Sequence, residues 1–198
     1  TEMKRPIIIE FSGLPNSGKT TLLHNLDLLC KREHLNALIV QEPAELIPSD
    51  IPKGSIAQNL WITLETLQRN IESIYKNNFD CILIDRGFYN QLFWATMYAD
   101  KDPWYSNFIM NFMRDFEKKY KVRPDYLYVV DVGISESIKR RAANGGTVTF
   151  SKKEFLNDYR IKFREFYENI EPRLYIDTTN LSESEVAFTV FERLKKLL

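Results

Sequence analysis

IIIEFSGLPNSGKTTLL, residues 7–23, is the stretch that decides the fold of this chain. Within it, Gly13 to Thr20 fits the pattern G-x-x-x-x-G-K-[ST], the P-loop, whose glycines let consecutive backbone N–H groups point at phosphate oxygens. The apolar run 7–9 before the loop is typical of a buried strand, and leucines at helical spacing follow the loop. The stretch therefore predicts a strand, a phosphate-binding loop and a helix, in the order that such a loop requires.

The residues of this loop have separate roles in holding a nucleotide. Lys19 is expected to reach the β- and γ-phosphates, and the hydroxyl of Thr20 is expected to ligate Mg²⁺. The helix that begins near Gly18 adds its positive N-terminal end to the same site. The residues predicted to bind the nucleotide are Gly13, Asn16, Ser17, Gly18, Lys19, Thr20 and Thr21.

The composition indicates a globular chain without a preference for polyanions. Its 198 residues suit a single domain, 44% of them are hydrophobic, and the formal net charge is zero. A zero net charge gives no general attraction to nucleic acid or to anionic membranes, and no apolar run reaches the length of a transmembrane helix. We interpret Cys30 and Cys81, which sit in apolar surroundings without metal-ligand spacing, as reduced core cysteines of a cytoplasmic protein.

Strand-like and helix-like segments alternate along the chain. Strands are predicted at 6–12, 37–42, 79–85, 124–131 and 173–177, and helices at 18–34, 55–77, 88–120, 134–144, 151–170 and 181–198. The long third helix is expected to break at Asp102-Pro103, because proline can begin a helix but not continue one. The alternation predicts a single α/β domain, residues 1–198, with a parallel sheet of about five strands covered by helices on both faces. Ligands of such sheets bind at the carboxyl ends of the strands.

An acid follows the third predicted strand, in the run Cys81-Ile82-Leu83-Ile84-Asp85-Arg86-Gly87. Apolar residues ending in an aspartate are typical of a Walker B strand, whose acid holds Mg²⁺ directly or through water. We therefore expect Thr20 and Asp85 to form the metal site. Arg86 would then lie at the mouth of the sheet, near a phosphate or hydroxyl of the substrate. The alternative role for Asp85 is to cap the helix that follows.

Basic residues end the helix predicted at 134–144, in Ser137-Ile138-Lys139-Arg140-Arg141, just before Asn144-Gly145-Gly146. The glycine pair offers hinge freedom directly after the arginines. One interpretation is therefore a lid segment near 139–152, in which Arg140 and Arg141 close over the phosphoryl group in transfer. The other is that these cations compensate the dipole at the helix C-terminus.

Glu42 stands at the end of the second predicted strand, in Gln41-Glu42-Pro43. Pro43 favours an extended conformation at Glu42, which would project its carboxylate toward the acceptor. A general base for a hydroxyl acceptor is one interpretation, and a structural or solvent-facing acid is the other. Arg86 is expected at the end of the adjacent strand, so both side chains would face the same space.

Aromatic residues, 13% of the chain, are concentrated in 88–120. There a residue with an aromatic ring recurs at every fourth position, which predicts a stripe that faces the core. The stripe consists of Trp104, Phe108, Phe112 and Phe116. A second set lies nearer the proposed acceptor side, and we expect at least one of its members to stack on a base. This set consists of Trp61, Phe88, Tyr89 and Trp94.

In these features and their order, the chain resembles the P-loop nucleoside and nucleotide kinases, specifically the thymidylate kinase and deoxynucleoside kinase group. The shared features are the stretch G-x-x-x-x-G-K-T-T, Glu42-Pro43, Asp85-Arg86, the strand Pro124–Val132, the basic helix at Arg140-Arg141, the aromatic helix 155–166 and the strand and loop 175–180. They span most of the chain, and only the P-loop is specific by itself. The resemblance implies a P-loop kinase fold and ATP as the phosphate donor with Mg²⁺. It also implies that a last loop borders the adenine, through Asp177, Thr179 and Asn180.

Two kinds of acceptor remain open, a nucleoside monophosphate and a nucleoside. Thymidylate kinases carry an arginine for the acceptor phosphate on the helix before the Asp-Arg pair, but Leu64 falls in that slot and Arg69 is the nearest candidate. The aromatic spacing in 155–166 is closer to the deoxynucleoside kinases, whereas Asp85 before Arg86 is closer to the thymidylate kinases. We lean slightly toward a monophosphate, because Arg69 could reach its phosphate through a shifted helix register.

The predicted reaction is transfer of the γ-phosphoryl group of Mg·ATP to a small-molecule acceptor of this kind. The predicted acceptor-binding residues are Glu42, Trp61, Arg69, Arg86, Phe88 and Tyr89, and the predicted catalytic residues are Lys19, Glu42, Arg86, Arg140 and Arg141. Two alternatives remain, a P-loop kinase of a non-nucleotide small molecule and a P-loop ATP-binding module without transfer activity. A GTPase switch is disfavoured, because the sequence lacks the N-K-x-D stretch that reads guanine. The sequence leaves a homodimer open.

Overall fold

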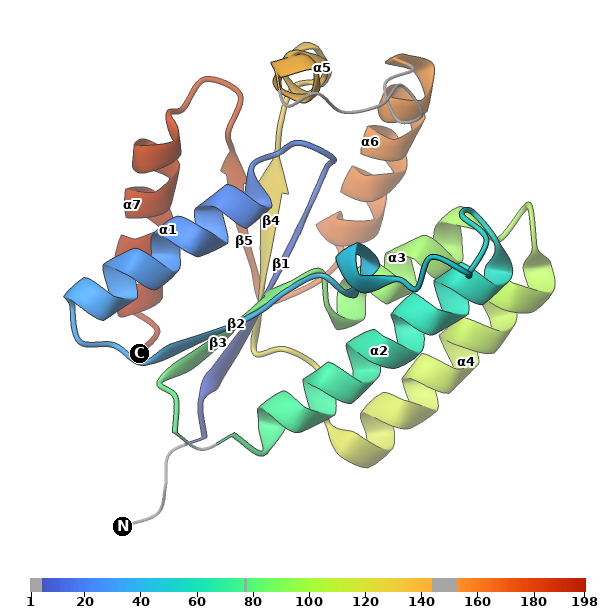
Figure 1. Ribbon diagram of the computed structural model, residues 1–198, viewed down its shortest axis with the longest axis horizontal. Helices are drawn as coiled ribbons and strands as arrows, with labels where there is room; N and C mark the ends of the chain where they lie inside the picture. The colour runs from blue at the N-terminus through green and yellow to red at the C-terminus, as the bar shows by residue number, and fades with distance from the viewer. Residues whose placement is uncertain (1–4, 77, 144–152) are drawn as a thin grey trace.

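Five parallel strands form the centre of the computed structural model, which describes residues 5–76, 78–143 and 153–198 (Figure 1). The strands are β1 (Ile7–Gly13), β2 (Ala37–Val40), β3 (Cys81–Asp85), β4 (Tyr126–Asp131) and β5 (Arg173–Asp177). They lie in the order β2-β3-β1-β4-β5, so the first strand in the chain is the central strand of the sheet. The predicted parallel sheet of five strands is confirmed.

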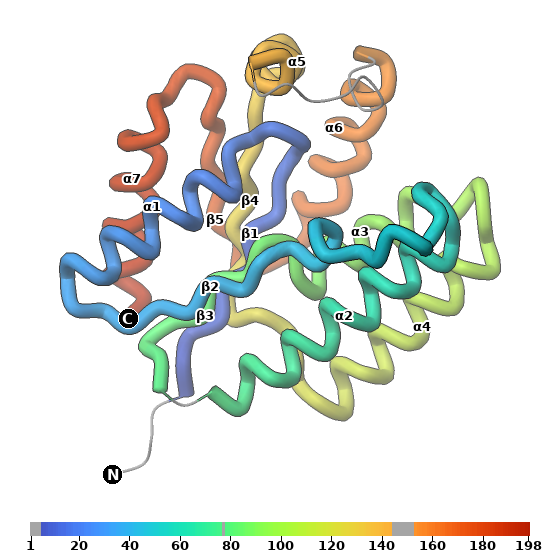
Figure 2. The backbone as a smooth tube through the Cα atoms, viewed as in Figure 1, coloured from blue at the N-terminus to red at the C-terminus, as the bar shows by residue number. Residues whose placement is uncertain are grey.

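Helices cover both faces of the sheet. They are α1 (Lys19–Arg32), the 3-10 helix η1 (Pro43–Leu46), α2 (Ile56–Ile74), α3 (Phe88–Met97), α4 (Pro103–Tyr120), α5 (Ile134–Ala143), α6 (Lys153–Glu168) and α7 (Glu183–Lys195). α1 and α7 pack on one face, around a core that includes Leu26 and Val190. α2, α3, α4 and α6 pack on the other face, around Phe93 and Phe163 (Figures 1 and 2). The predicted two-sided covering is confirmed, and α5 lies beyond the carboxyl ends of the strands.

The junction of α3 and α4 shows how the sequence sets the boundaries of elements. α3 ends at Met97, and Asp102 caps α4 by accepting a hydrogen bond of 2.9 Å from the backbone N–H of Tyr105. Pro103 occupies the first position of α4, where its missing N–H is not needed. The predicted break at Asp102-Pro103 is therefore confirmed.

The aromatic stripe on α4, which we predicted to face the core, is partly exposed. Trp104 and Phe108 are 64% and 45% exposed, and their rings stack with centroids 5.5 Å apart. The buried side chains of α4 belong to a face turned by one residue, which includes Tyr105, Ile109 and Met113. The prediction was wrong for Trp104 and Phe108, because a spacing of four residues identifies an apolar stripe but not the direction in which it faces.

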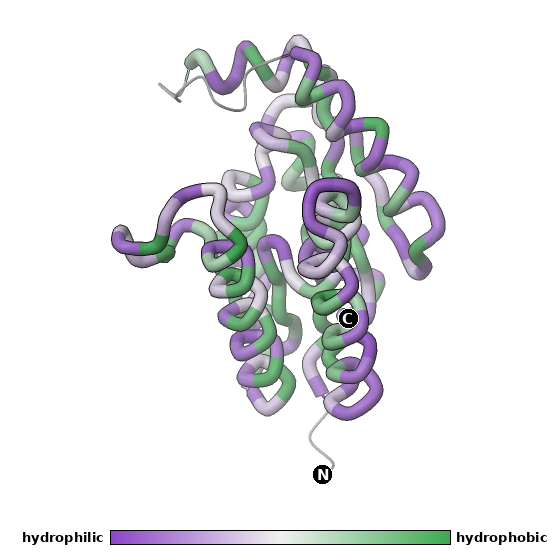
Figure 3. The backbone as a smooth tube through the Cα atoms, turned by 90° about the vertical axis from the view of Figure 1, so that its right-hand side faces the viewer, coloured by the Kyte–Doolittle hydropathy of each residue, from purple (hydrophilic) through white to green (hydrophobic). Residues whose placement is uncertain are grey.

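The hydropathy of the chain follows the two-sided packing. Figure 3 shows apolar segments in green alternating with polar segments in purple along the helices, as expected for helices with one buried face. Within residues 5–76, 78–143 and 153–198, no helix has the length and apolar character needed to cross a bilayer.

Candidate active site

A glycine lets β1 pass directly into the P-loop beside β4. A Cβ atom on Gly13 would lie 2.3 Å from the carbonyl oxygen of Val130 and 2.8 Å from Oγ of Ser17, so a larger residue does not fit there. Gly18, the residue before α1, has a φ of 88°, in the left-handed region that favours glycine. The loop therefore turns tightly onto the start of α1, whose first N–H groups have no intrahelical partner and favour an anion.

The side chain of Lys19 folds back over the loop. Its Nζ donates hydrogen bonds to the carbonyl oxygens of Gly13 and Leu14, both at 3.3 Å, and the residue is only 6% exposed. Burial, together with the charge of Arg86, lowers the pKa of Lys19 to about 8, against the opposing effect of two nearby carboxylates. A buried ammonium with carbonyl partners gains strongly from a phosphate oxygen, because charged hydrogen bonds are the stronger ones.

Thr20 and Asp85 meet where β3 ends beside the start of α1. The hydroxyl of Thr20 donates to Oδ2 of Asp85 at 3.2 Å, and Oδ1 of Asp85 is buried with no hydrogen-bond partner in the described part of the chain. Burial raises the pKa of Asp85, and the charges of Lys19 and Arg86 oppose this rise. A bare carboxylate oxygen beside a hydroxyl fits Mg²⁺, which prefers oxygen ligands and is often held by one or two protein groups together with phosphate oxygens. Thr20 and Asp85 are thus the residues that would hold the ion.

A cavity of about 380 Å³, which we call the donor cavity, opens beside the P-loop. Its P-loop side is lined by four of the predicted nucleotide-binding residues, Asn16, Ser17, Gly18 and Thr21. Arg140 of α5 also lines it, and donates to the carbonyl oxygen of Thr178 at 2.7 Å and to Oε1 of Glu136 at 3.0 Å. The donor cavity therefore joins the phosphate-binding loop to a cation on α5.

The loop between β5 and α7 borders the donor cavity, but not through the residues that we predicted. Its lining residues include Thr178, Leu181 and Ser182. Thr179 instead accepts a hydrogen bond from the backbone N–H of Gly133 at 2.7 Å, and its own N–H donates to Asp177 at 2.9 Å. Asp177, Thr179 and Asn180 are not among its lining residues, and the side chains of Asp177 and Thr179 bond within the loop and to Gly133.

A larger cavity, about 600 Å³, lies where β2 and β3 end and α3 begins, and we call it the acceptor cavity. Glu42 and Arg86 both line it, and Nη1 of Arg86 donates to Oε1 of Glu42 at 2.8 Å. The side chains are 18% and 16% exposed. Arg86 has a φ of 56°, and its backbone N–H donates to the carbonyl oxygen of Phe11 at 3.0 Å. The two side chains face the same space, as we expected from the ends of adjacent strands.

The aromatic residues around the acceptor cavity differ from the predicted set. Trp94 lines it, but Phe88 and Tyr89 are each 3% exposed and pack inside the core. Trp61 is also not among the lining residues. These three do not line the cavity as predicted: α3 turns its first two rings, Phe88 and Tyr89, into the core, and Trp61 lies on α2 outside the lining. The aromatic residues that line the cavity are Trp94, Tyr98, Tyr105 and Phe155.

Two amides on α3, Asn90 and Gln91, line the acceptor cavity and were missed in the sequence. Both are 3% exposed. The amide of Gln91 lies 3.0 Å and 3.3 Å from the hydroxyls of Thr63 and Thr66, and Oδ1 of Asn90 has no hydrogen-bond partner among the described residues. The sequence could have indicated this, because Asn90 and Gln91 lie four and three residues before Trp94, and residues at this spacing share a helix face.

Arg69 does not reach the acceptor cavity. Its guanidinium pairs with Glu65 at 2.9 Å and donates to the carbonyl oxygen of Gln41 at 3.3 Å, along the outer edge of β2. The shifted helix register that would bring Arg69 to an acceptor phosphate is therefore not observed. This removes the reason for our lean toward a monophosphate.

The two predicted lid arginines face different cavities. Arg140 lines the donor cavity and Arg141 the acceptor cavity, because adjacent residues on a helix point about 100° apart. The lid predicted near 139–152 is described as far as Ala143; Asn144-Gly145-Gly146 and the residues to 152 lie outside the described ranges. α6 follows, and Asp131 at the end of β4 anchors it by accepting hydrogen bonds from Arg160 and Arg164.

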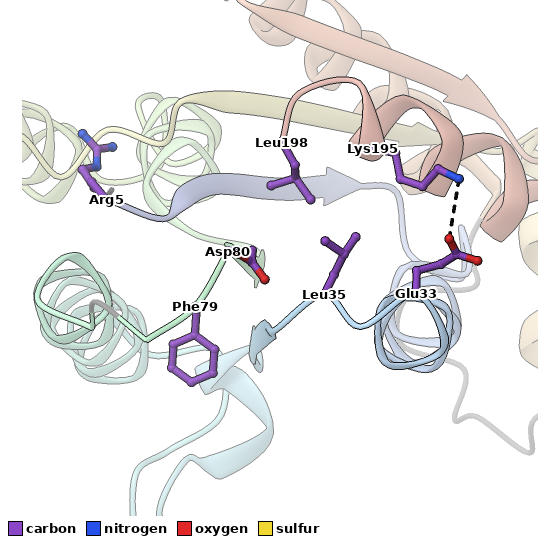
Figure 4. Close-up of a pocket in the computed structure, with 7 residues that line it drawn as sticks. All are labelled: Arg5, Glu33, Leu35, Phe79, Asp80, Lys195 and Leu198. Carbon is purple, nitrogen blue, oxygen red and sulfur yellow. Dashed lines mark ion pairs between the residues drawn. The ribbon is translucent and has the colours of Figure 1, made fainter. Parts of the chain in front are cut away.

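A third cavity, about 390 Å³, lies at the opposite ends of the strands, as Figure 4 shows. Its lining includes Arg5 before β1 and Asp80 before β3, with Lys195 and Glu33 paired at 4.0 Å. This place is far from the carboxyl ends of the strands, where ligands of parallel sheets bind. We therefore assign the chemistry to the donor and acceptor cavities.

The sheet order, the P-loop and the two cavities at the carboxyl ends of the strands define a class of fold, that of the P-loop nucleoside and nucleotide kinases. Solved structures of a deoxyadenosine kinase from M. mycoides share this fold. One, with the products dCMP and a flexible dCDP bound, is 17% identical with a TM-score of 0.70. Another, with dCTP bound, is 18% identical with a TM-score of 0.68, and both matches cover 96% of this chain and 100% of the other. No family model matches the chain, and no curated protein is similar in sequence.

Proposed function

We propose that this chain is an ATP-dependent kinase of a nucleoside. The observation that carries the proposal is the Glu42–Arg86 pair, a carboxylate held at 2.8 Å in a cavity beside the P-loop. The charges of both members of this pair act on Lys19, so the pair lies near the P-loop. The related fold of a deoxyadenosine kinase supports the same function.

The paired charges of Glu42 and Arg86 favour a neutral hydroxyl over a monophosphate at their end of the acceptor cavity, which Lys53, Lys101 and Arg141 also line. Glu42 neutralises the charge of Arg86, and Arg69 binds elsewhere. A monophosphate needs a cation and no base, whereas a neutral hydroxyl gains from a carboxylate that takes its proton. The pairing of Arg86 with Glu42 therefore supports a nucleoside.

The shape and chemistry of the cavity walls support a flat, hydrogen-bonding ligand. Trp94 and Phe155 contribute aromatic rings to the lining, and Asn90 and Gln91 contribute amides that can read the edge of a base. A volume of about 600 Å³ is in the usual range for small-molecule sites, which runs from about 300 to 1,000 Å³. A nucleoside combines a flat base with a free hydroxyl, which matches both parts of the cavity.

The reaction uses residues of both cavities. The carboxylate of Glu42 takes the proton of the acceptor hydroxyl as the oxygen attacks the γ-phosphorus and the bond to the β–γ bridging oxygen breaks. Lys19 holds the β- and γ-phosphates, and Arg86 fixes Glu42 through its Nη1. Mg²⁺, held by Thr20 and Asp85, would supply charge neutralisation at the phosphates.

Glu42→Gln tests this function with a panel of nucleosides and nucleoside monophosphates. If Glu42 is the base, turnover of the best nucleoside should fall about 10²-fold or more, with a small change in its KM. Glu45→Gln is the matched control, because Glu45 is an exposed acid on the 3-10 helix η1 that directly follows Glu42, and it does not line the cavity. Turnover of monophosphates alone, or release of ADP without any acceptor in the panel, would contradict the proposal.

The proposed protein partner is a second copy of this chain. We propose a homodimer through the exposed stripe on α4, because Trp104 and Phe108 are stacked large apolar side chains facing outward. A twofold axis would set the acidic start of α4, at Asp100 and Asp102, against the basic end of its copy. That end carries Lys118 and Lys119.

We propose a cytoplasmic location from the free, buried thiols of Cys30 and Cys81.

A further inference from the structure

A buried carboxylate on β1 holds the start of α3. Glu10 is 0% exposed in the central strand of the sheet. Its Oε2 accepts a hydrogen bond from the backbone N–H of Tyr89, and its Oε1 accepts one from the backbone N–H of Asn90, both at 2.9 Å. These are the second and third residues of α3, whose N–H groups have no partner within the helix. Glu10 therefore caps α3 from the sheet.

The residue in the N-cap position of α3 does not cap the helix with its own side chain. Gly87 precedes α3 and has no side chain to accept a hydrogen bond. A Cβ atom on Gly87 would lie 3.0 Å from Oε2 of Glu10 and 3.1 Å from Cγ2 of Ile84. The space that a capping side chain would need is thus occupied by the carboxylate of the strand.

The helix that Glu10 holds carries the acceptor cavity. Asn90, Gln91 and Trp94 of α3 line that cavity, and Arg86 directly precedes the helix. The backbone N–H of Arg86 is bound to the carbonyl oxygen of Phe11, the residue after Glu10. Two consecutive residues of β1 therefore fix this junction, and the same strand ends at Gly13 in the P-loop.

We propose that Glu10 is a positioning residue of the acceptor cavity. Its carboxylate fixes the first turn of α3 on the strand that carries the P-loop, and so sets where the acceptor lies relative to the phosphate donor. The role rests on the proposed function. It acts through Asn90, whose backbone N–H it binds and whose side chain lines the acceptor cavity, because Glu10 itself is buried and lines neither cavity.

The geometry requires a carboxylate at position 10. Its oxygens accept from two backbone N–H groups and from the hydroxyl of Ser12 at 3.0 Å, and a negative group is favoured at a helix N-terminus. Burial raises the pKa of Glu10 to about 7, opposed by these hydrogen bonds. The ionisable groups that face it are Tyr89 of α3 and Tyr167 of α6, and the pKa of each is raised, so both are neutral near pH 7.

Glu10→Gln tests the role, because the amide keeps the shape but turns an NH₂ group toward one of the helix N–H groups. At pH 8 we expect the KM for the nucleoside to rise about tenfold, the scale of losing a hydrogen bond to a charged group, with the KM for ATP nearly unchanged. The matched control is Asp125→Asn. Asp125 also accepts a backbone N–H of β1, from Ile8 at 2.8 Å, but at the end of the strand far from both cavities. The control should leave both KM values unchanged.

The pH profile gives a second measurement. As the pH falls through about 7, protonation of Glu10 should raise the nucleoside KM of the wild type, whereas Glu10→Gln should show no such rise. A folded Glu10→Gln variant with a wild-type nucleoside KM, or with equal losses for ATP and nucleoside, would overturn the positioning role alone. A wild-type protein that phosphorylates no nucleoside would overturn the proposed function, and the positioning role with it.

Discussion

At the scale of single residues, the lowered pKa of Lys19 has a measurable consequence. Its value of about 8 in the free protein means that the ammonium begins to lose its proton just above neutral pH. ATP needs the charged form, so the Kd for ATP should rise as the pH is raised from about 7 to 9. Isothermal titration at several pH values measures this change. A Kd that stays constant over this range would contradict the assignment.

Lys19→Met separates the loss of this charge from a loss of folding. The variant should keep its circular dichroism spectrum and lose phosphoryl transfer by about 10²-fold or more, since phosphoryl transfer depends mainly on stabilising the charge that develops at the phosphates. Lys31→Met is the control, because Lys31 lies on the same helix, exposed and paired with Asp27. Near-normal transfer by a folded Lys19→Met protein would exclude the kinase function.

Residues that directly follow strands were easier to place than residues whose partners lie on another helix or strand without such a pattern. The motif residues around Lys19 and the pair Glu42 and Arg86 follow strands whose ends meet at one edge of the sheet, so their meeting could be predicted. Gln91 could not, because its partners Thr63 and Thr66 come from another helix. The capping role of Glu10 depends likewise on a contact between β1 and α3 that no local pattern reveals.

At the scale of elements, α5 lies between the two cavities. Arg140→Ala should chiefly weaken ATP binding, since Arg140 lines the donor cavity. Arg141→Ala should chiefly raise the KM for the nucleoside, since Arg141 lines the acceptor cavity. Steady-state kinetics with each substrate varied in turn measures both effects. Equal effects of the two variants on both substrates would show that α5 does not divide its arginines in this way.

The course of the helices explains which element-level predictions failed. Apolar periodicity and a proline located the break before α4 and the strands to within a few residues. The direction in which a helix face points was harder to predict, because a stripe such as the one at Trp104 and Phe108 is apolar whether it faces the core or a partner. Arg69 shows the same limit on α2, where a pairing with Glu65, four residues before it, holds the side chain at the outer edge of β2.

At the scale of the whole molecule, the exposed stripe on α4 should decide the oligomeric state. The double variant Trp104→Ser/Phe108→Ser removes two exposed rings, which are 64% and 45% exposed, and should shift the protein from dimer to monomer in light scattering. Its stability should change little, since neither ring is part of a core. Phe188→Ser is the control, because Phe188 is 61% exposed on α7, at another part of the surface. A wild-type monomer at all concentrations would contradict the dimer.

The place of β1 at the centre of the sheet matters while the chain is being synthesised. β1 is made first, but its neighbours β3 and β4 are separated from it by long stretches of chain. On the ribosome, the backbone N–H and C=O groups along both of its edges therefore stay unpaired until residues 81–85 emerge for one side and residues 126–131 for the other. Unpaired edges of this kind can pair with other chains, so the strand that later carries the P-loop is exposed to aggregation during synthesis and would gain from a chaperone.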